Sequence, residues 1–550
     1  MGHCKADSTL QFLDFGPKLQ RTRRGPHTVA ASVNRLASLA VSLSLLCGQK
    51  FTFKLDLFML PNMADISADL PQECWMRIFD SLPARDLWQC LFVSKYWNAL
   101  ATPYQYREIS WTWHPIPIQK FFLLIRVLLN HPKRTYHIRH VHLLSDQKVR
   151  SIQSWEPPMC ATDCTKDIVG FKDVVQWATG IIKHAKFPDA QIWIRELEDG
   201  NPYAYVSVLL SQLHNLRSLH LDYSFVWQSG FPGLMLHHAL FSQERTSLSR
   251  FNFLTDVDYG GNVRRAAIVE DVNENLEEEG YPSCNPRQFL PWFHLPSLQS
   301  LSLWARTRKI LDTAERRPDL SQLRHLALVR ATLQEDQLPE LLSLCSSLEV
   351  LHLGMAYKWR REIALQNGSA IVQALKSVSG SITNLSFGLE YYPPNEFWSW
   401  LEFGEEDLST PFYGILKGFP HLRYVEIPIE LLVGWSTKPW SNFGSVLPKK
   451  IEKLCLRGDY EPLSGSKWHE RSILDLVANN VVNRRVDIPE LKHIVIHKWR
   501  PLYEKRTLAK KRAEVREICQ GEGVELEVVC DGLSTGLWVD TKPCPERVIC

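Results

Sequence analysis

The residues of this chain that could carry out chemistry are scattered, and few of them stand at the spacing that a reaction or a metal site needs. Cys160 and Cys164 form a Cys-x3-Cys pair, but a tetrahedral zinc site needs two more ligands, and no nearby cysteine or histidine pair supplies them. His469-Glu470, and His137 near His140, also stand alone. We interpret them as loop thiols and surface residues, and we predict no catalytic residue, no metal and no cofactor.

The sequence also lacks motifs of several large enzyme classes. It has no Gly-x4-Gly-Lys-Ser/Thr phosphate loop, no Gly-x-Gly-x2-Gly dinucleotide fingerprint and no His-Glu-x2-His zinc motif. Lys and Arg number 63 against 60 Asp and Glu, and the net charge of +3 gives no general reason to expect nucleic-acid binding. The 13 cysteines are odd in number and scattered, which favours a reduced intracellular compartment. We therefore predict a protein that is not an enzyme and whose chemistry is binding.

The stretch from Leu70 to Ile109 is the first candidate binding element. Apolar residues at Cys74, Ile78 and Leu82 recur at helical spacing and predict an amphipathic helix. A unit of about forty residues is too small to bury this apolar surface by itself, so part of the surface is expected to contact a partner. The first helix is predicted to begin at Asp69 and Pro71 and to end at Pro83. Asp86 is the predicted cap of the second helix. Ser94 is the predicted cap of the third helix, which Pro103 is expected to end.

This stretch resembles an F-box, the helical module by which many proteins bind the Skp-type adaptor of a cullin-RING ubiquitin ligase. The resemblance rests on Leu-Pro-x-Glu, Ile-Phe, Leu, Asp-Leu, Val-Ser and Trp in this order, and Tyr104-x-Tyr106-Arg107-x-Ile109 resembles the end of fungal members. It implies an F-box over residues 66–110. By resemblance, the residues that divide between the core of the module and the adaptor groove are Leu70, Pro71, Glu73, Ile78, Phe79, Leu82, Leu87, Val93 and Trp97.

Beyond Trp111 a short pattern, Leu-x2-Leu-x-Leu or a close apolar substitute, keeps returning. Its last two apolar residues lie two apart and therefore on one face of a short strand. Helical stretches such as 174–185 and 371–378 lie between copies, and no such unit can bury its apolar face alone, which predicts a stacked solenoid. The copies begin at Ile138, Leu216, Leu248, Leu298, Leu323, Leu348, Ile382, Leu422, Ile451 and Leu491.

The pattern resembles leucine-rich repeats. The copies at Leu298, Leu323 and Leu348 follow one another at 25 residues, within the range of that family, but the usual Asn or Cys after the strand is absent and later spacings are uneven. The predicted fold class is therefore α/β, with an N-terminal three-helix F-box followed by an irregular leucine-rich-repeat solenoid, or horseshoe, and a C-terminal cap. By resemblance, residues beside the strand leucines face the concave side, and the candidate substrate-binding residues are His220, Asp222, Trp304, His352, Glu426, Arg457 and His497.

Residues 1–62 differ in composition from the rest of the chain. They hold eight Lys or Arg against three acids, and an apolar run from Leu36 to Cys47. Basic residues before a run too short to span a bilayer suit a signal or transit segment. Met63, seven residues before the F-box motif, is an alternative start. Three interpretations stay open: an upstream extension or disordered tail, which we favour, an organelle-targeting segment, and a secretory signal.

The remaining segments complete the predicted domain plan. Residues 111–210 are taken as a linker and the start of the array, and residues 211–500 as degenerate repeats with an acidic, solvated insertion at 259–286. The stretch 508–519 predicts a charged helix, and 524–528 alternates as a half-buried strand should. We expect these two elements to cap the solenoid over residues 501–530, and residues 531–550 to form a loose tail.

The leading hypothesis is a substrate-recognition subunit of an SCF-type ubiquitin ligase. Its F-box binds the Skp-type adaptor, and through it the cullin-RING ligase, while the repeats bind a protein substrate. A second hypothesis keeps the adaptor but assigns no degraded substrate, so that the chain is a scaffold. A third, a secreted or membrane-associated leucine-rich-repeat binding protein, needs residues 1–48 to be a working signal. The leading hypothesis implies a cytoplasmic or nuclear protein without nucleic-acid or membrane partners.

Overall fold

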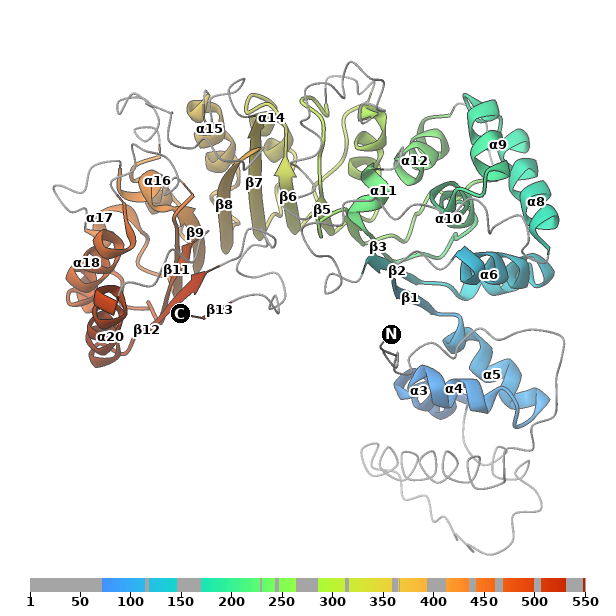
Figure 1. Cartoon of the computed structure of the whole chain (residues 1–550), viewed down its shortest axis with the longest axis horizontal. Coiled ribbons are helices and arrows are strands. Elements are labelled where there is room, and N and C mark those ends of the chain that lie inside the picture. Colours follow the sequence, from blue (N-terminus) through green and yellow to red (C-terminus); the bar gives the residue numbers. More distant parts are fainter. Residues whose placement is uncertain are drawn as a thin grey trace, which may run out of the picture.

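A computed structural model of the chain shows a long curved sheet with helices on its outer side and a small helical unit below one end (Figure 1). This description covers only the residues whose placement is defined, and all structural statements below refer to them. They are 72–113, 118–145, 170–227, 230–242, 247–263, 285–311, 316–358, 365, 367–392, 412–434, 442–459, 468–498, 506–530 and 548–549.

The sheet has 13 strands that follow one another in sequence order. Every neighbouring pair from β1 to β12 is parallel, and only β13 pairs antiparallel, with β12. This order is typical of a solenoid, in which each unit contacts only its neighbours. The strands are β1 Glu108–Trp113, β2 His140–Ser145, β3 Ser218–Leu221, β4 Asp256–Tyr259, β5 Ser300–Leu303, β6 His325–Ala331, β7 Val350–Lys358, β8 Asn384–Tyr392, β9 Tyr424–Pro428, β10 Lys453–Arg457, β11 His493–Lys498, β12 Glu525–Cys530 and β13 Val548–Ile549.

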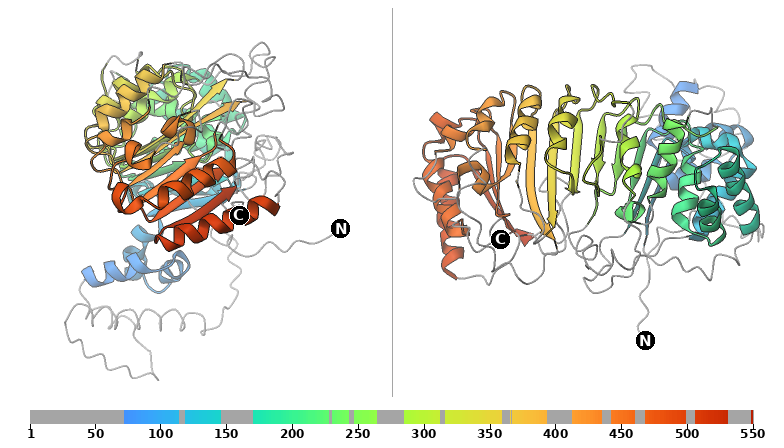
Figure 2. Two further views of the ribbon diagram at one scale, coloured as in Figure 1. Left: turned by 90° about the vertical axis from the view of Figure 1, so that its left-hand side faces the viewer. Right: turned by 90° about the horizontal axis from the view of Figure 1, so that it is seen from above.

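The helices line the convex side of the sheet, so that seen from above they alternate with the strands along the row (Figure 2). They are α6 Ile118–Asn130, η1 Pro132–His137, α8 Phe171–His184, α9 Ala190–Glu198, α10 Pro202–Leu210, α11 Tyr223–Trp227, α12 Phe231–Phe241, η3 Pro286–Gln288, η4 Leu290–His294, α14 Gln337–Ser343, α15 Gly368–Val378, η6 Ile415–Gly418, α16 Ile429–Val433, α17 Phe443–Val446, α18 Glu470–Val481, α19 Arg484–Asp487 and α20 Arg506–Gly521.

One continuous hydrophobic core lies between the sheet and these helices. The strand leucines that the repeat pattern predicted are its centre: Leu219, Leu301, Leu326 and Leu351 are each at most 1% exposed. The core runs without interruption from Ile109 on β1 to Val528 on β12. A single core of this length explains how the irregular spacing of the repeats is tolerated, because every unit buries its apolar face against the next.

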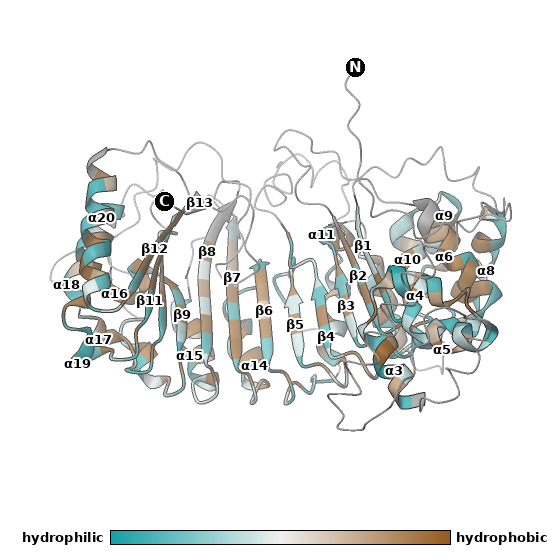
Figure 3. Ribbon diagram, turned by 90° about the horizontal axis from the view of Figure 1, so that it is seen from below, coloured by the Kyte–Doolittle hydropathy of each residue, from teal (hydrophilic) through white to brown (hydrophobic). Residues whose placement is uncertain are grey.

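The parallel register aligns equivalent positions on the face of the sheet opposite to the helices, here called the inner face. The first inner row is Glu108, His140, Ser218, Asp256, Ser300, His325, Val350, Asn384, Tyr424, Lys453, His493 and Glu525. The second inner row is Ser110, His142, His220, Asp258, Ser302, Ala327, His352, Ser386, Glu426, Cys455, Val495 and Glu527. Figure 3, seen from below, shows the resulting alternation of hydrophilic and hydrophobic residues along the strands.

The N-terminal unit consists of α3 Gln72–Ser81, α4 Ala84–Cys90 and α5 Lys95–Gln105. Ser94 caps α5 as predicted, since its Oγ accepts a hydrogen bond from the amide of Trp97 at 3.1 Å. Asp86 does not cap α4, because the helix begins at Ala84 and Pro83 is its N-cap residue, whose carbonyl accepts from the amides of Asp86 and Leu87. Pro103 does not end α5 either, since in the last turn a proline removes few helical hydrogen bonds.

Most predicted strands are confirmed, but the copy placed at Leu248-Phe251-Phe253 is wrong. Phe251 has a positive φ of 51° and Phe253 is 55% exposed, so this segment turns instead of pairing. The strand of this unit, β4, lies six residues later and follows the pattern Leu254-x2-Val257-x-Tyr259. Two apolar triplets at the same spacing compete here, and only the later one extends the ladder from β3 to β5.

Residues 111–210 contain less linker than expected. Strands β1 and β2 begin the sheet, and α6, α8, α9 and α10 contribute buried residues to the continuous core. The pattern Tyr106-x2-Ile109-x-Trp111, hidden in the end of the F-box motif, therefore starts the repeat array. At the other end, α20 and β12 form the predicted helix and strand, and the expected loose tail returns at Val548–Ile549 as β13.

Several predictions lie outside the described residues and remain predictions. They concern the segment 1–62, the pair Cys160 and Cys164, most of the insertion at 259–286, and residues 531–547.

Candidate functional site

The F-box-like unit has a small core of its own, separate from the core of the solenoid. Trp97 packs edge-to-face against Trp75 and Phe79 at its centre, with ring centroids 4.8 Å and 5.7 Å apart. Ile78, Leu82, Leu87, Cys90 and Ala101 complete the buried set. The three helices thus fold around aromatic packing that the helical spacing of the sequence predicted.

The structure divides the nine residues expected at the adaptor unevenly. Ile78, Phe79, Leu82, Leu87 and Trp97 are buried inside the unit, Val93 is half-buried, Glu73 is exposed, and Leu70 and Pro71 lie outside the described residues. The large apolar residues that reach the surface are Met76, Phe92 and Tyr96, which are 40%, 70% and 48% exposed. Sequence reasoning missed these three, although Met76 and Tyr96 stand where the helical period turns away from the buried face. Phe92 lies in the turn after α4.

Polar contacts tie this unit to the first strands of the sheet. Arg107 forms an ion pair with Asp80 of α3, and its carbonyl accepts hydrogen bonds from the amides of Arg139 and His140 at 2.8 and 3.0 Å. Tyr106 accepts a hydrogen bond from Arg134 at 2.8 Å, and the guanidinium lies 4.9 Å from its ring centroid. The F-box-like unit is therefore joined to the solenoid by more than the chain itself.

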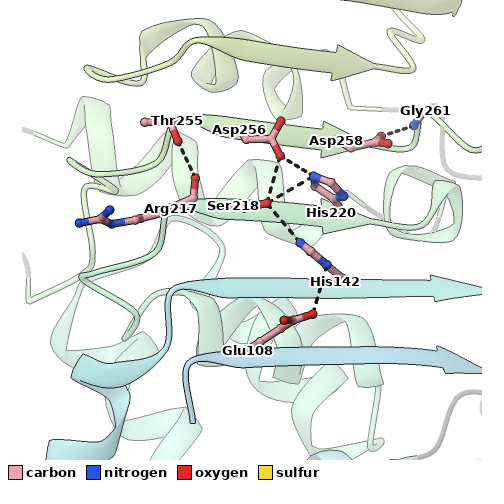
Figure 4. A network of polar contacts seen from close by, with 9 residues as sticks. All are labelled: Glu108, His142, Arg217, Ser218, His220, Thr255, Asp256, Asp258 and Gly261. Atoms are coloured by element: carbon pink, nitrogen blue, oxygen red, sulfur yellow. Dashed lines mark hydrogen bonds and ion pairs between the residues drawn. The ribbon is translucent and has the colours of Figure 1, made fainter. Parts of the chain in front are cut away.

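The second candidate site is a polar network on the inner face of β1 to β4 (Figure 4). His220 Nε2 donates to Asp256 Oδ2 at 2.7 Å, and Ser218 Oγ donates to the same oxygen at 3.1 Å. His142 Nε2 lies 3.2 Å from Ser218 Oγ, and its ring stacks on His220 with centroids 4.4 Å apart. Glu108 Oε1 lies 3.9 Å from His142 Nδ1. These side chains form one chain of contacts across four neighbouring strands.

The network keeps contact with solvent. The side chains of Glu108, His142, His220 and Asp256 are 53%, 27%, 30% and 40% exposed. Burial lowers the pKa of His142, and the neighbouring His220 lowers it further, so His142 is neutral at pH 7. Burial opposes ionisation of Asp256, but the hydrogen bond and charge of His220 outweigh it and lower the pKa of that carboxyl. The face therefore carries carboxylates beside neutral imidazole at neutral pH.

Asp258 adds a second carboxyl to β4, two residues after Asp256 and on the same face. Its Oδ1 accepts a hydrogen bond from the amide of Gly261 at 2.7 Å. A side chain at Gly261 would clash with Asp258 and Ser302, which explains the glycine in this turn. Burial raises the pKa of Asp258 to about 6, and the nearby carboxyls of Asp256 and Asp222 act in the same direction. Negative charge is therefore concentrated at this end of the network.

The network contains the residue types of a nucleophilic triad, but its geometry does not fit that chemistry. Glu108 and His142 are farther apart than a hydrogen bond, and Ser218 already donates its only hydroxyl hydrogen to Asp256. His220 Nε2 lies within hydrogen-bond distance of both Ser218 and Asp256, whereas in a triad the hydroxyl and the carboxylate contact different nitrogens of the histidine. The arrangement suits the binding of polar or charged groups.

On the inner face of β8 to β10, charged side chains are closed off from solvent instead. Arg457 Nη1 donates to Glu426 Oε1 at 2.6 Å, and its Nε and Nη2 contact Asp459 at 3.0 to 3.1 Å. Burial opposes the charge of Arg457, but Asp459 and Glu426 outweigh it and raise its pKa. Asp459 Oδ2 also accepts from the amide of Leu389 at 2.9 Å, on the part of β8 beyond its pairing with β9. The cluster therefore links β8, β9 and β10 through side-chain contacts.

The seven predicted substrate-binding residues mostly belong to the interior. His220 is half-buried in the open network, whereas Asp222, Trp304, His352, Glu426, Arg457 and His497 are at most 9% exposed. Asp222 shows the cause, since it follows the strand and holds the next turn by accepting from Asn262 at 2.6 Å. Sequence reasoning missed Asp256 and Asp258, because the strand that carries them was placed six residues too early. It also missed His142, although its strand was predicted correctly. Any role in substrate binding stays a prediction.

Two families match parts of the chain. The F-box-like family matches residues 67–110, and the family described as "FBD-associated F-box protein At5g56370, LRR repeats" matches residues 275–384. No curated protein matches the chain. The first match covers the helical unit with the separate core, and the second covers β5 to β7 and the start of β8. The chain therefore combines an F-box-like region with leucine-rich repeats in an open parallel sheet.

Two further kinds of site are absent from the described residues. No group of three or more His, Cys, Asp or Glu side chains is arranged there to hold a metal ion. No helix in that part of the chain is both long and apolar enough to cross a membrane. A Gly-x-Ser-x-Gly pattern occurs at 532–536, outside the described residues, and carries no argument here.

Proposed function

We propose that this chain is a substrate-recognition subunit of an SCF-type cullin-RING ubiquitin ligase. The observation that carries the proposal is the F-box-like match over residues 67–110, on a helical unit that has its own core and is joined to a leucine-rich-repeat sheet. The F-box-like unit binds the Skp-type adaptor, and the sheet binds a protein substrate. The chain then supplies orientation and effective concentration, while the ligase supplies the catalytic groups. The proposal implies a cytoplasmic or nuclear protein, and includes the likeness of its Tyr104–Ile109 segment to fungal F-box members.

The adaptor contacts we propose come from two sources, the exposed apolar residues of the structure and the resemblance to an F-box. Met76, Phe92 and Tyr96 offer the exposed apolar area, since burying a large apolar side chain contributes about 1.5 to 3 kcal/mol. By resemblance, Leu70, Pro71, Glu73 and Val93 belong to the same surface. Ile78, Phe79, Leu82, Leu87 and Trp97 support it from inside the unit.

A matched pair of surface variants tests the adaptor contact. We expect M76A/F92A to weaken binding of a purified Skp-type adaptor at least about 30-fold, measured by calorimetry with the full chain. The control is V482A/V486A, which removes two apolar side chains that are 58% and 76% exposed at the opposite end of the solenoid. Core variants such as I78A are unsuitable, because the loss of a buried side chain would unfold the unit. Equal adaptor binding by wild type and M76A/F92A, or none by the wild type, contradicts the proposal.

A second experiment separates a degradation subunit from a scaffold. Proximity labelling of cells that express wild type or M76A/F92A, under proteasome inhibition, identifies proteins captured by the repeats in both cases. A degradation subunit predicts that the half-lives of captured proteins lengthen in the variant after the inhibitor is removed. Unchanged half-lives together with intact capture would favour the scaffold.

A further inference from the structure

The open end of the inner face carries charge of one sign. On β1 to β6 its two inner rows contain the carboxyls of Glu108, Asp256 and Asp258 and no Lys or Arg. Four arginines, Arg107, Arg139, Arg217 and Arg324, stand one residue before these rows. Arg107 forms an ion pair with Asp80 and Arg324 with Glu349, and Figure 4 shows Arg217 extending away from the network. The other residues of these rows are Ser110, His140, His142, Ser218, His220, Ser300, Ser302, His325 and Ala327. A ligand that complements this surface is therefore cationic.

The distance between the carboxyls of Glu108 and Asp256 predicts the spacing of the cationic groups in the ligand. Glu108 and Asp256 occupy the same inner row, three strands apart, which corresponds to about 14 Å in a parallel sheet. In an extended peptide, residues i and i+4 point to the same side and lie about 13 to 14 Å apart. The two distances agree, so an extended segment that crosses the strands can present one basic side chain to each carboxyl.

We propose that the inner face of β1 to β4 binds an extended segment of a partner protein that carries two Lys or Arg residues four positions apart. The inference deepens the proposed function, on which it rests, by naming the kind of segment that the repeats receive. The first basic side chain contacts Glu108, and the second contacts Asp256. The residue midway between them, at i+2, faces His142 and Ser218, which accept or donate hydrogen bonds to a polar side chain.

Asp256 is able to receive a cation although it already has partners. Its Oδ2 accepts from His220 and Ser218, Ser300 also donates to this carboxyl, and a carboxylate offers about four acceptor positions in total. Asp258, two residues along the same strand, gives the second cation another acceptor nearby. The raised pKa of Asp258 reflects burial and then the neighbouring carboxyls, and a bound cation would relieve that repulsion.

The other end of the sheet does not offer the same complementarity. Of the two acids that the second inner row holds there, Glu426 is buried and pairs with the buried Arg457. Glu527 on β12 therefore has no solvent-exposed acid three strands away in its row. In the first inner row, Lys453 on β10 lies over the ring of Tyr424, and Glu525 pairs with His493 at 2.9 Å. Charge complementarity therefore selects the end of the inner face nearest the F-box-like unit.

Synthetic peptides test this assignment on the full chain. We use fluorescein-labelled 11-residue peptides of Ser, Thr and Gly with two lysines, placed at i and i+4 in one peptide and at i and i+1 in the other. We expect the i,i+4 peptide to bind about tenfold more tightly by fluorescence anisotropy in 0.05 M salt, and to lose affinity in 0.5 M salt. Equal binding of the two peptides, or tighter binding of a matched glutamate peptide, would overturn the proposal.

Variants locate the site. E108Q/D256N should weaken binding of the i,i+4 peptide about tenfold at an unchanged melting temperature. The matched control is E525Q, which removes an exposed acid of the same inner row at the other end of the sheet and should leave affinity unchanged. An equal loss in E525Q would mean non-specific attraction. If no peptide binds the full chain but the i,i+4 peptide binds a chain that starts at Met63, the occupant is the basic segment 1–62 and the proposal is wrong.

The peptide assay contains no adaptor, so its outcome is independent of the test of the F-box-like unit. Peptide binding without adaptor binding would support the proposed peptide-binding surface and reject the proposed function. Adaptor binding without selective peptide binding would reject the surface and leave the proposed function intact.

Discussion

The two ends of the inner face hold their charged side chains in opposite ways. Near β3 and β4, His220 and Asp256 have side chains that are 30% and 40% exposed, and their hydrogen bonds are open to water. Near β9 and β10, Glu426 and Arg457 occupy neighbouring repeats with side chains that are 0% and 1% exposed. The open end has charges that a partner could neutralise, whereas the closed end neutralises its charges internally.

The difference shows why a polar residue beside a strand leucine is weak evidence for a binding site. In water, a charged pair gains little from its partner because solvent screens it, and either group can exchange its partner for a ligand. When the same pair is buried, separating the two groups leaves an uncompensated charge in the interior, so the pair stabilises the fold. The register puts both kinds of residue on the inner face, and only burial distinguishes them.

The largest expected effect is at the closed end. Replacing Arg457 by Met leaves Glu426 and Asp459 buried without their cation and should lower the free energy of unfolding by about 3 to 5 kcal/mol. Chemical denaturation followed by circular dichroism measures the change. The control is Arg423→Met, which breaks an exposed pair with Glu452 and should cost less than about 1 kcal/mol. A similar decrease in the free energy of unfolding in both variants would mean that the pairs of Arg457 are not shielded from solvent.

Acid should also destabilise the closed end. Burial lowers the pKa of His352 to about 3, so between pH 6.5 and pH 3 the unfolded chain binds a proton at this histidine and the folded chain does not. This residue therefore contributes stability that is present above pH 6.5 and is lost on acidification by up to about 1.4 kcal/mol per pH unit. His352→Gln should flatten the fall of stability between pH 6.5 and 5, measured by denaturation at each pH, relative to the exposed control His325→Gln. An unchanged slope would contradict the burial of His352.

At the open end, one carboxyl should respond to pH in the opposite direction. The pKa of Asp258 is raised to about 6 from 3.8, so the folded state binds this proton more tightly than the unfolded state does. The contribution to stability is complete below pH 3.8 and is lost as the pH rises through 6. Asp258→Asn, which keeps an acceptor for the Gly261 amide, should raise the free energy of unfolding by about 1 kcal/mol at pH 7 and leave it unchanged at pH 3.5. A destabilised variant at pH 7 would refute this assignment.

The smallest expected effect comes from the centre of the open network. Asp256→Asn should change the free energy of unfolding by less than about 1 kcal/mol, because water can replace the hydrogen bonds of a half-exposed carboxyl. Thermal melting of this variant beside Arg457→Met gives a direct ranking of the two ends. A loss at Asp256 as large as that at Arg457 would erase the distinction between them.

The sequence predicted much of the fold because the repeat pattern records burial. Leu219, Leu301, Leu326 and Leu351 each stand on a predicted strand and in the core, since period-two apolar residues can only face the helices in this architecture. The failure at Leu248 came from the same rule, because a turn residue and an exposed phenylalanine happened to repeat the spacing. Local spacing cannot choose between two overlapping triplets, whereas pairing with both neighbouring strands can.

The candidate sites were less predictable than the fold. Met76 stands out only when the opposite face of α3 is known to be buried, and Phe92 only when the turn after α4 is known to leave it exposed. Glu426 and Asp256 look alike in sequence, since each is an acid beside a strand leucine. Their different roles depend on Arg457, which lies on the next strand and 31 residues away in the chain. Glu426 and Arg457 meet because of the register between their strands. This register depends on the lengths of the repeats, which cannot be read from the sequence because the loops are irregular.

Chemical modification of histidines tests the central distinction most directly. Diethyl pyrocarbonate acts on accessible neutral imidazole, and mass spectrometry of the native full chain reports the modified positions. We expect His142 at the open end, whose imidazole is neutral, to react readily, and the buried His352 on β7 and His497 on β11 to react only after denaturation. Comparable modification of all three histidines in the native protein would contradict this difference, because the two ends of the inner face would then be equally open.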